Sequence, residues 1–459
     1  MPNTFIHRTP SSASNRRTWT WSAWIKRASF GSSSNGHTLW ETEGTNGGDN
    51  FIFQIKSSND TVHLHTYGND VFTTTRKLRD TSAWYHIVLA MDTTQGTAAN
   101  RIKLYINGEL QAITQAALFP SQNFEFGINK NHKHCIGSHG TNADYYFDGL
   151  MSHIHFSDGY ALAPTVFGET DSTTGEWKIK VDPSFTLGTN GFTVLKDGNT
   201  ITDQSANSNN FSVTGAGLTN TKDCPSNVLA VMNPLAKFRS GATVTQGNNT
   251  VTTTTAKAGV PSTLGIPSDK GKFYVELKMA TLPTDSRFHF GLLPFECPVA
   301  DDPVNATNLG IMLSGYNASI YAGGGNINAF YGGVGRFNSF TGILGMAVDL
   351  TSSTKTIAFS KDGAWITGSN ATSTDFSNAL KVNITSYLSI SPHWNVGVGN
   401  GNSSGTQGVY QMNFGNGYYG TTAITTNSGN GYEGAEGASK FSYPVPSGYS
   451  ALSTKGLNL

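Results

Sequence analysis

The chain has 459 residues, only 13% of which are charged, and its 30 Lys and Arg residues equal its 30 Asp and Glu residues in number. Without a net charge, the protein has no long-range field that would draw it to nucleic acid or to an anionic membrane. Glycine is abundant at 52 residues. Ser, Thr and Asn crowd the gaps between apolar runs, which favours an all-β protein in which tight turns join many short strands.

No apolar run approaches the roughly 20 residues that a membrane helix needs. Residues 1–14 lack the apolar core of a signal peptide, so we expect a protein made and folded in a cytoplasm. Cys135, Cys224 and Cys297 are odd in number and widely spaced. We therefore expect packed or idle thiols and neither a disulfide framework nor a thiolate zinc site.

The first expected strand is Thr18–Arg27, in which Trp19, Trp21, Ala23 and Ile25 share one face. So much aromatic surface must be buried in a core. Further strands are expected at Phe51–Ile55, Thr61–Tyr67, Trp84–Met91, Arg101–Ile106 and Tyr145–Phe156. Their spacing predicts a sandwich of two antiparallel sheets over residues 1–175.

A hairpin lies at the centre of this predicted domain. The strand around Val88 has apolar residues on both faces, which is typical of a strand in the middle of a sheet, whereas Arg101–Ile106 alternates between charged and apolar residues. Asn107–Gly108 supplies the positive φ angles of the following turn. Leu110–Leu118 has helical propensity, so we expect only its start to be the returning strand and leave the rest open.

Residues 176–236 lack sustained periodicity and predict an irregular connector, ordered or partly disordered. A second β-sandwich is expected over residues 237–459, with strands at Phe273–Met279 and Phe288–Leu292. Leu344–Ile366 repeats the hairpin of the first domain, with Asp362–Gly363 at its turn. We expect the C-terminal segment to wrap back on this domain.

Several motifs carry family resemblances. Four in the first domain occur in order over about the first 170 residues: Trp21–Lys26, Trp84–Val88, Leu104–Gly108, and Ile136–Ser138 followed by Tyr146–Met151. They resemble the laminin-G-like, concanavalin A-like jelly roll. Six more follow in the second domain: Gly271–Glu276 with Phe290–Leu292, Leu309–Ile311, Gly345–Leu350, Ile357–Trp365 and Met412–Gly415. They resemble a SPRY domain. The resemblances imply two jelly-roll sandwiches, of families that bind carbohydrate or protein ligands.

The connector carries a third resemblance. Its runs are Gly191–Val194, Asp203–Phe211 and Cys224–Leu235. They look like a connector that follows laminin-G-like domains in virion proteins of tailed phages. This resemblance implies a protein displayed on a virus particle.

Catalysis is the first chemistry to weigh, because the concanavalin A-like fold also houses glycosidases, which need two carboxylates. The Glu-x-Asp-x-x-Glu pattern of the glucanases is absent. Glu41 and Glu43 would share a strand face beside Trp40, but glycines follow at once, so we expect this pair at a solvated strand end. Asp301 and Asp302 are a weaker pair, in a loop. We expect no enzyme activity.

Three His-x-His pairs raise the question of metal binding: His63/His65, His132/His134 and His153/His155. Alternation predicts that the first and third pairs project from the outer face of a strand, and the second lies in a polar loop. Two imidazoles are half of a metal site, which a trimer could complete on its axis. We favour exposed histidines on water-facing strands, and we expect no metal and no cofactor.

Glycan binding needs aromatic faces beside polar groups, gathered in loops. Five aromatic residues with Asn, Asp or Glu nearby fit this description: Trp40, Tyr145, Tyr316, Tyr331 and Trp394. The alternative for each is an aromatic ring packed at the end of a sandwich.

The sequence as a whole predicts a non-enzymatic virion protein of a tailed phage, made in the host cytoplasm and located on the virion surface as a tail fibre, head fibre or capsid decoration. Its expected partners are other virion proteins, a host surface glycan or receptor, and further copies of itself in a homo-oligomer, with a trimer preferred. A capsule-degrading tailspike glycosidase and a purely structural capsid or tail cement are the alternatives.

Overall fold

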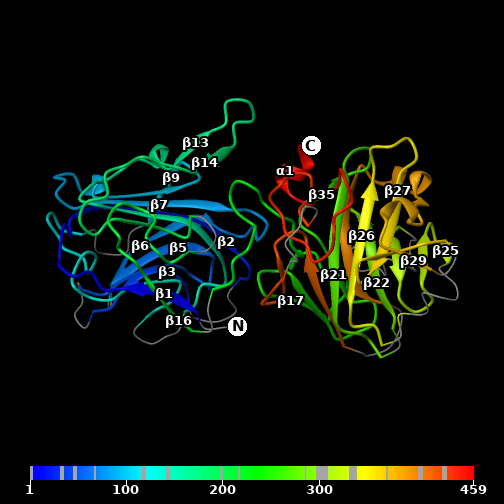
Figure 1. Ribbon diagram of the computed structural model, residues 1–459. Helices are drawn as coiled ribbons and strands as arrows, with labels where there is room; N and C mark the ends of the chain where they lie inside the picture. Colours follow the sequence, from blue (N-terminus) through cyan, green and yellow to red (C-terminus); the bar gives the residue numbers. More distant parts are fainter. Residues whose placement is uncertain are drawn as a thin grey trace. The chain divides into compact units, whose positions relative to one another are not determined.

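The computed structural model describes the chain apart from residues 1–3, 31–35, 45–48, 67–68, 115–119, 141–144, 197–199, 216–217, 285, 296–308, 330–336, 338, 369–370, 402–406 and 426–431. The chain divides into two compact units, Met1–Asn220 and Thr221–Leu459 (Figure 1). The predicted all-β class is confirmed, because strands dominate both units beside short 3₁₀ turns and the four-residue helix α1 (Thr454–Leu457). Within the described ranges, no helix has the length and apolar character to cross a membrane.

The first unit contains two main antiparallel sheets. In spatial order, the eight-stranded sheet consists of β10 (Ile113–Thr114), β6 (Asn69–Lys77), β5 (Thr61–Thr66), β4 (Phe51–Ile55), β3 (His37–Thr42), β11 (His134–Ile136), β1 (Phe5–Arg8) and β16 (Ser212–Thr214). The six-stranded sheet consists of β15 (Phe192–Val194), β12 (Gly149–Asp158), β2 (Thr18–Arg27), β7 (Tyr85–Asp92), β8 (Ile102–Ile106) and β9 (Glu109–Leu110). A separate hairpin pairs β13 (Gly168–Thr170) with β14 (Trp177–Ile179).

Tryptophan side chains join the two sheets of the first unit. Trp19 and Trp21 from β2 lie against Trp40 from β3, with ring centroids 5.6 and 6.1 Å apart. The strand register shifts between Thr38 and Trp40, so Leu39 and Trp40 both enter the core although they are neighbours in sequence. This contact between facing sheets establishes the predicted sandwich.

The predicted hairpin at the centre of the first domain is confirmed. β7 lies between β2 and β8, and Asn107 and Gly108 turn the chain with φ angles of 50° and 79°. The returning strand β9 ends at Leu110, and residues 115–119 lie outside the described ranges. Trp177 packs on the turn so closely that a β-carbon on Gly108 would lie 2.5 Å from its ring.

The residues of the predicted connector divide between the two units at Asn220. β15 extends the six-stranded sheet by pairing with β12, and β16 pairs with β1. Phe192 and Phe211 are buried in the core of the first unit. β15 and β16 have three residues each, which is too few to show the alternation of a strand. Single apolar residues such as Phe192 and Phe211 were the only sign in the sequence that this region is packed.

The second unit also contains two main sheets. The ten-stranded sheet runs through β17 (Ala242–Thr245), β18 (Thr250–Thr253), β32 (Gly408–Asn413), β21 (Lys272–Thr281), β26 (Ile343–Asp349), β27 (Thr356–Lys361), β28 (Ala364–Ile366) and β29 (Thr372–Ser373), with β30 (Val382–Asn383) on β27 and β35 (Ser450–Ala451) on β21. The seven-stranded sheet contains β19 (Gly259–Pro261), β31 (His393–Asn400), β22 (Phe288–Pro294), β23 (Ile311–Ser314), β24 (Ser319–Ala322) and β25 (Gly325–Ala329), with β20 (Ile266–Pro267) on β31. A short hairpin joins β33 (Tyr418–Tyr419) to β34 (Thr422–Ala423).

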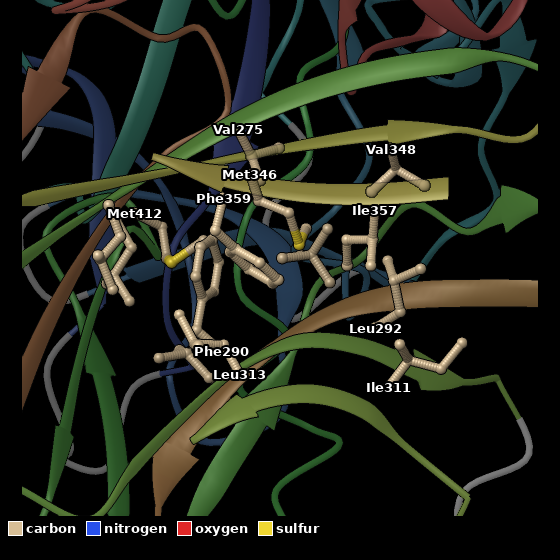
Figure 2. Close-up of a cluster of buried hydrophobic side chains, with 14 of the residues drawn as sticks. Val275, Phe290, Leu292, Ile311, Leu313, Met346, Val348, Ile357, Phe359 and Met412 are labelled. Atoms are coloured by element: carbon tan, nitrogen blue, oxygen red, sulfur yellow. The ribbon is translucent and has the colours of Figure 1, made fainter. Parts of the chain in front are cut away.

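Side chains from these two sheets meet in the core of the second unit. Figure 2 shows Met346 and Phe359 of the ten-stranded sheet facing Phe290 and Leu313 of the seven-stranded sheet. The expected second hairpin is present as β26 and β27, which pair over six residues, and Asp362 and Gly363 follow with positive φ. The second unit is therefore a sandwich in its own right.

The C-terminal segment packs on the second unit as predicted. β35 pairs in parallel with β21, and a buried carboxylate, that of Glu276 in β21, holds the chain just before it. Glu276 accepts hydrogen bonds from the backbone nitrogens of Ser442 and Tyr443 at 2.9 Å and from the Tyr419 hydroxyl at 2.6 Å. Because the carboxyl group is fully buried, its pKa is raised despite these donors.

Candidate ligand-binding surface

Two of the aromatic residues predicted to bind glycan are wrongly placed for that role. Trp40 and Trp394 have no exposed surface and belong to the two cores. Successive residues of a strand point to opposite faces, so a polar neighbour such as Glu41 or Asn395 implies that the tryptophan beside it points inward. The alternative of a packed ring holds for both residues.

The other three candidates differ in position. Tyr145 is half-buried, with a φ of 52°, in the first unit. Tyr316 is 38% exposed in the second unit, and the Arg287 guanidinium lies 4.4 Å from its ring centroid. Tyr331 lies outside the described residues. Tyr145 and Tyr316 therefore remain as accessible rings, one in each unit.

A row of side chains crosses the outer face of the eight-stranded sheet, on strands β3 to β6. The register places Glu41 opposite Ile52, Ile52 opposite His65, and His65 opposite Asp70. Trp40, the neighbour of Glu41, points into the core. The row therefore faces away from the sandwich interior, and we call it the outer row.

Asp70 is the accessible carboxylate of the outer row, with 48% of its side chain exposed. Neutral His63 donates from Nε2 to Asp70 Oδ1 at 2.8 Å, and Lys56 Nζ lies 3.6 Å from the other carboxylate oxygen. Burial lowers the pKa of His63 to about 4, with Lys56 and the stacked His65 ring adding to the effect. A neutral imidazole thus orients an acceptor that is open to solvent.

Glu41 contradicts the expectation of a solvated strand end, because it is fully buried. The segment after β11 covers it: Gly140 N donates to Glu41 Oε2 at 2.5 Å, and His139 Nε2 lies 3.4 Å from Oε1. The Tyr145 ring stands edge-on to His139 at 5.5 Å. Glu43 stays partly exposed and pairs with Lys133. Glu41 therefore holds Gly140 and His139, and the Tyr145 ring packs on His139 beside the outer row.

Four of the six histidines in the His-x-His pairs are buried, and His65 and His132 are half-buried, which corrects the expectation of water-facing imidazoles. His63 and His65 do lie on an outer face, but His153 and His155 are covered, and Phe167 stacks on His155. His134 receives a hydrogen bond from Asn129 N and is buried in the first unit. Sequence alternation gives the face of a strand but not the segment that covers it. In the described ranges, no group of three or more His, Cys, Asp or Glu residues is arranged to hold a metal ion.

Ser22 and His86 in the first unit are the residue types of a catalytic pair, but the histidine donates its proton to the serine instead of accepting one from it. Trp177 Nε1 donates to His86 Nδ1 at 3.0 Å, which leaves the imidazole proton on Nε2. That proton points to Ser22 Oγ at 2.9 Å, so the serine accepts and is not deprotonated by the histidine. Burial lowers the pKa of His86 to about 3.

Cys135 offers no nucleophile either. It lies opposite Glu41 in the sheet register. Burial, and to a lesser extent the Glu41 charge, raises its thiol pKa to about 12. A thiol of this kind is protonated at neutral pH and inert.

Residues 6–166 match the concanavalin A-like lectin/glucanases superfamily. This match confirms the predicted family of the first domain. The comparison with curated protein sequences gives no match.

Solved structures with low sequence identity are also similar to parts of the chain. The SPRY domain of human HERC1 is 12% identical with a TM-score of 0.28, over 39% of this chain and 96% of that domain. Domains LG4-5 of the mouse laminin α1 chain are 10% identical with a TM-score of 0.28, over 96% of this chain and 83% of theirs. The CBM40 of a Ruminococcus gnavus sialidase, solved with α2,3-sialyllactose, is 16% identical with a TM-score of 0.23, over 34% and 92%.

Proposed function

We propose that the chain is a non-enzymatic binding protein whose first unit recognises carbohydrate on a host cell surface. The observation that carries the proposal is the outer row, where Asp70 and Lys56 are accessible and the Tyr145 ring packs on His139 beside Glu41. Sugars are bound by an aromatic face together with a few oriented polar groups. The match of residues 6–166 to the concanavalin A-like lectin/glucanases superfamily supports recognition of a sugar.

The buried groups beneath this surface support binding more than turnover. Glu41 is occupied by Gly140 N, and Glu43 by Lys133, so neither of the two nearest carboxylates is poised as a free acid or base. Cys135 is held as a thiol, and Ser22 accepts from His86. Pre-oriented acceptors with no activated nucleophile are suited to holding a ligand.

In biological terms, the proposal is a protein on the surface of a tailed-phage virion, as a tail fibre, a head fibre or a capsid decoration. The resemblance of residues 191–235 to connectors of such proteins supports this location. A trimer would present several copies of the site, and avidity would then raise a weak affinity for each sugar by orders of magnitude. Its partners are other virion proteins and a bacterial surface glycan.

A glycan array followed by titration of the best ligand tests the proposal. Tyr145→Asn removes the ring but tolerates the positive φ, and Asp70→Asn removes the accessible carboxylate; each should lower affinity about tenfold, since one stacking or charged contact contributes about 1.4 kcal/mol. Glu109→Gln is the control, because Glu109 is exposed on β9 in the other sheet.

Other outcomes favour the alternatives. New reducing ends in host polysaccharide, lost in Glu41→Gln, would indicate a tailspike glycosidase. A blank array together with no adsorption to host cells would indicate structural cement.

A further inference from the structure

Arg27 occupies an unusual position in the first unit. It ends β2, in the series that places Trp19, Trp21 and Ile25 in the core. Alternation therefore directs the Arg27 side chain into the space between the two sheets, where its side chain has no exposed surface. A permanently charged group thus closes one end of the sandwich interior.

One side of the Arg27 guanidinium is fully used. Its Nη1 donates to Asp60 Oδ1 at 2.9 Å and to the Leu78 carbonyl oxygen at 2.5 Å. The guanidinium carbon also lies 4.9 Å from the centroid of the Phe30 ring. These contacts fix the plane of the guanidinium.

The other side of the guanidinium is unused. Nε and Nη2 are buried, and neither has a hydrogen-bond partner among the described residues. These two nitrogens present parallel N–H bonds, the edge through which arginine binds a carboxylate with two hydrogen bonds. Burying charged donors without hydrogen-bond partners costs free energy. An acceptor bound at the Nε and Nη2 edge would remove this cost.

Nearby carboxylates are already engaged. Asp60 Oδ2 accepts from Arg79 Nε at 2.9 Å, so two guanidinium groups share this one carboxylate. Asp148 Oδ2 accepts from Ser29 Oγ at 2.5 Å. Neither carboxylate bonds to the Nε and Nη2 edge of Arg27, so this edge keeps two donors without an acceptor.

From this geometry we propose that the Nε and Nη2 edge of Arg27 binds one carboxylate group, enclosed at the end of the first sandwich. A planar carboxylate matches the two parallel donors. The carboxylate can come from a small free anion or from an acidic sugar. The inference does not depend on the outer row, since Arg27 lies between the sheets and the outer row lies on their surface.

The test uses the full chain and sodium acetate as the probe. Thermal unfolding of wild type should shift upward and saturate as acetate rises at constant ionic strength. Arg27→Lys keeps the charge for Asp60 but lacks the two-donor edge, so the saturable shift should disappear. Arg79→Gln is the matched control, because it removes the exposed partner of the same Asp60 and should keep the shift. Equal responses in all three proteins would overturn the proposal.

A second measurement does not depend on a variant that folds. A crystal structure of wild-type protein grown in acetate should show the carboxylate bonded to Arg27 Nε and Nη2, whereas a water or a protein group there would overturn the proposal. Oligogalacturonate and a neutral galactose oligomer then distinguish the sources. Competition with acetate by the acidic oligomer alone indicates a glycan carboxylate, and competition by neither indicates a small-anion site.

Discussion

The two units differ in the buried groups whose pKa values burial shifts. The first unit encloses neutral imidazoles, among them His63, His86 and His134, whose pKa values are lowered to between about 3 and 4. The second unit encloses the carboxyl group of Glu276, whose pKa is raised. Both arrangements favour the uncharged form, as burial does, but they make the stabilities of the two units respond to pH in opposite directions.

The signs follow from proton binding. An imidazole with a folded pKa below 6.5 binds fewer protons than in the unfolded chain, so stability is lost as pH falls from about 6.5 towards 3. A carboxyl group with a raised folded pKa binds more protons than in the unfolded chain, so its contribution falls as pH rises through about 4.5. Acid should therefore weaken the first unit and spare the second.

The largest expected effect is acid destabilisation of the first unit. Between pH 7 and pH 5 each of His63, His86 and His134 should cost about 2 kcal/mol, or on the order of 5 kcal/mol together. Hydrogen exchange measured by mass spectrometry, corrected for intrinsic rates, should show faster exchange in β2, β3 and β7. Exchange in β21 and β26 should not accelerate; equal acceleration in both units would contradict the comparison.

A somewhat smaller effect is expected from Glu276→Ala. The variant leaves the Tyr419 hydroxyl and the nitrogens of Ser442 and Tyr443 without their buried acceptor, which should cost about 3–4 kcal/mol. Exchange should rise in residues 440–451 and β21 while the first unit is unchanged. The isosteric Glu276→Gln keeps one acceptor oxygen and should lie between Ala and wild type in urea unfolding.

Loosening the hairpin on the first unit should cost less. Trp177→Phe keeps an aromatic ring beside Gly108 but removes the donor to His86 Nδ1, a loss of about 1–2 kcal/mol. The pH at which the first unit loses stability should move little, because burial is the cause of the lowered His86 pKa. Urea unfolding at pH 7 and pH 5 measures both values, and a large change in the pH dependence would be inconsistent with this cause.

The smallest effect is expected at an exposed ion pair. Arg76 Nη1 lies 2.8 Å from Glu109 Oε2, and the Glu109 side chain is 74% exposed. Such pairs contribute about 0–1 kcal/mol, so Arg76→Gln should leave urea unfolding almost unchanged at both pH values. A cost above about 1 kcal/mol would mean that surface charge, and not buried groups, governs the pH response.

Sequence reasoning identified what depends on short-range pattern. The alternation of Trp19 and Trp21 predicted β2, and Asn107–Gly108 predicted a turn with positive φ, because both follow from local geometry. It was wrong about Trp40, Trp394 and the histidine pairs, since their burial depends on irregular segments that pack over the sheets. The burial of Arg27 could have been predicted from the sequence, because Arg27 continues the alternating series of inward-pointing residues in β2.

Glu276 also bears on how the second unit is made. Its carboxylate oxygens accept hydrogen bonds from Ser442 N and Tyr443 N, which are 166 and 167 residues further along the chain. These bonds tie β21 to the C-terminal segment. During synthesis, β21 therefore emerges with a carboxylate whose partners do not yet exist, and the unit cannot close until the segment through Ala451 has left the ribosome. Contacts of such long range make folding slow, so the second unit should need protection from aggregation while it is translated.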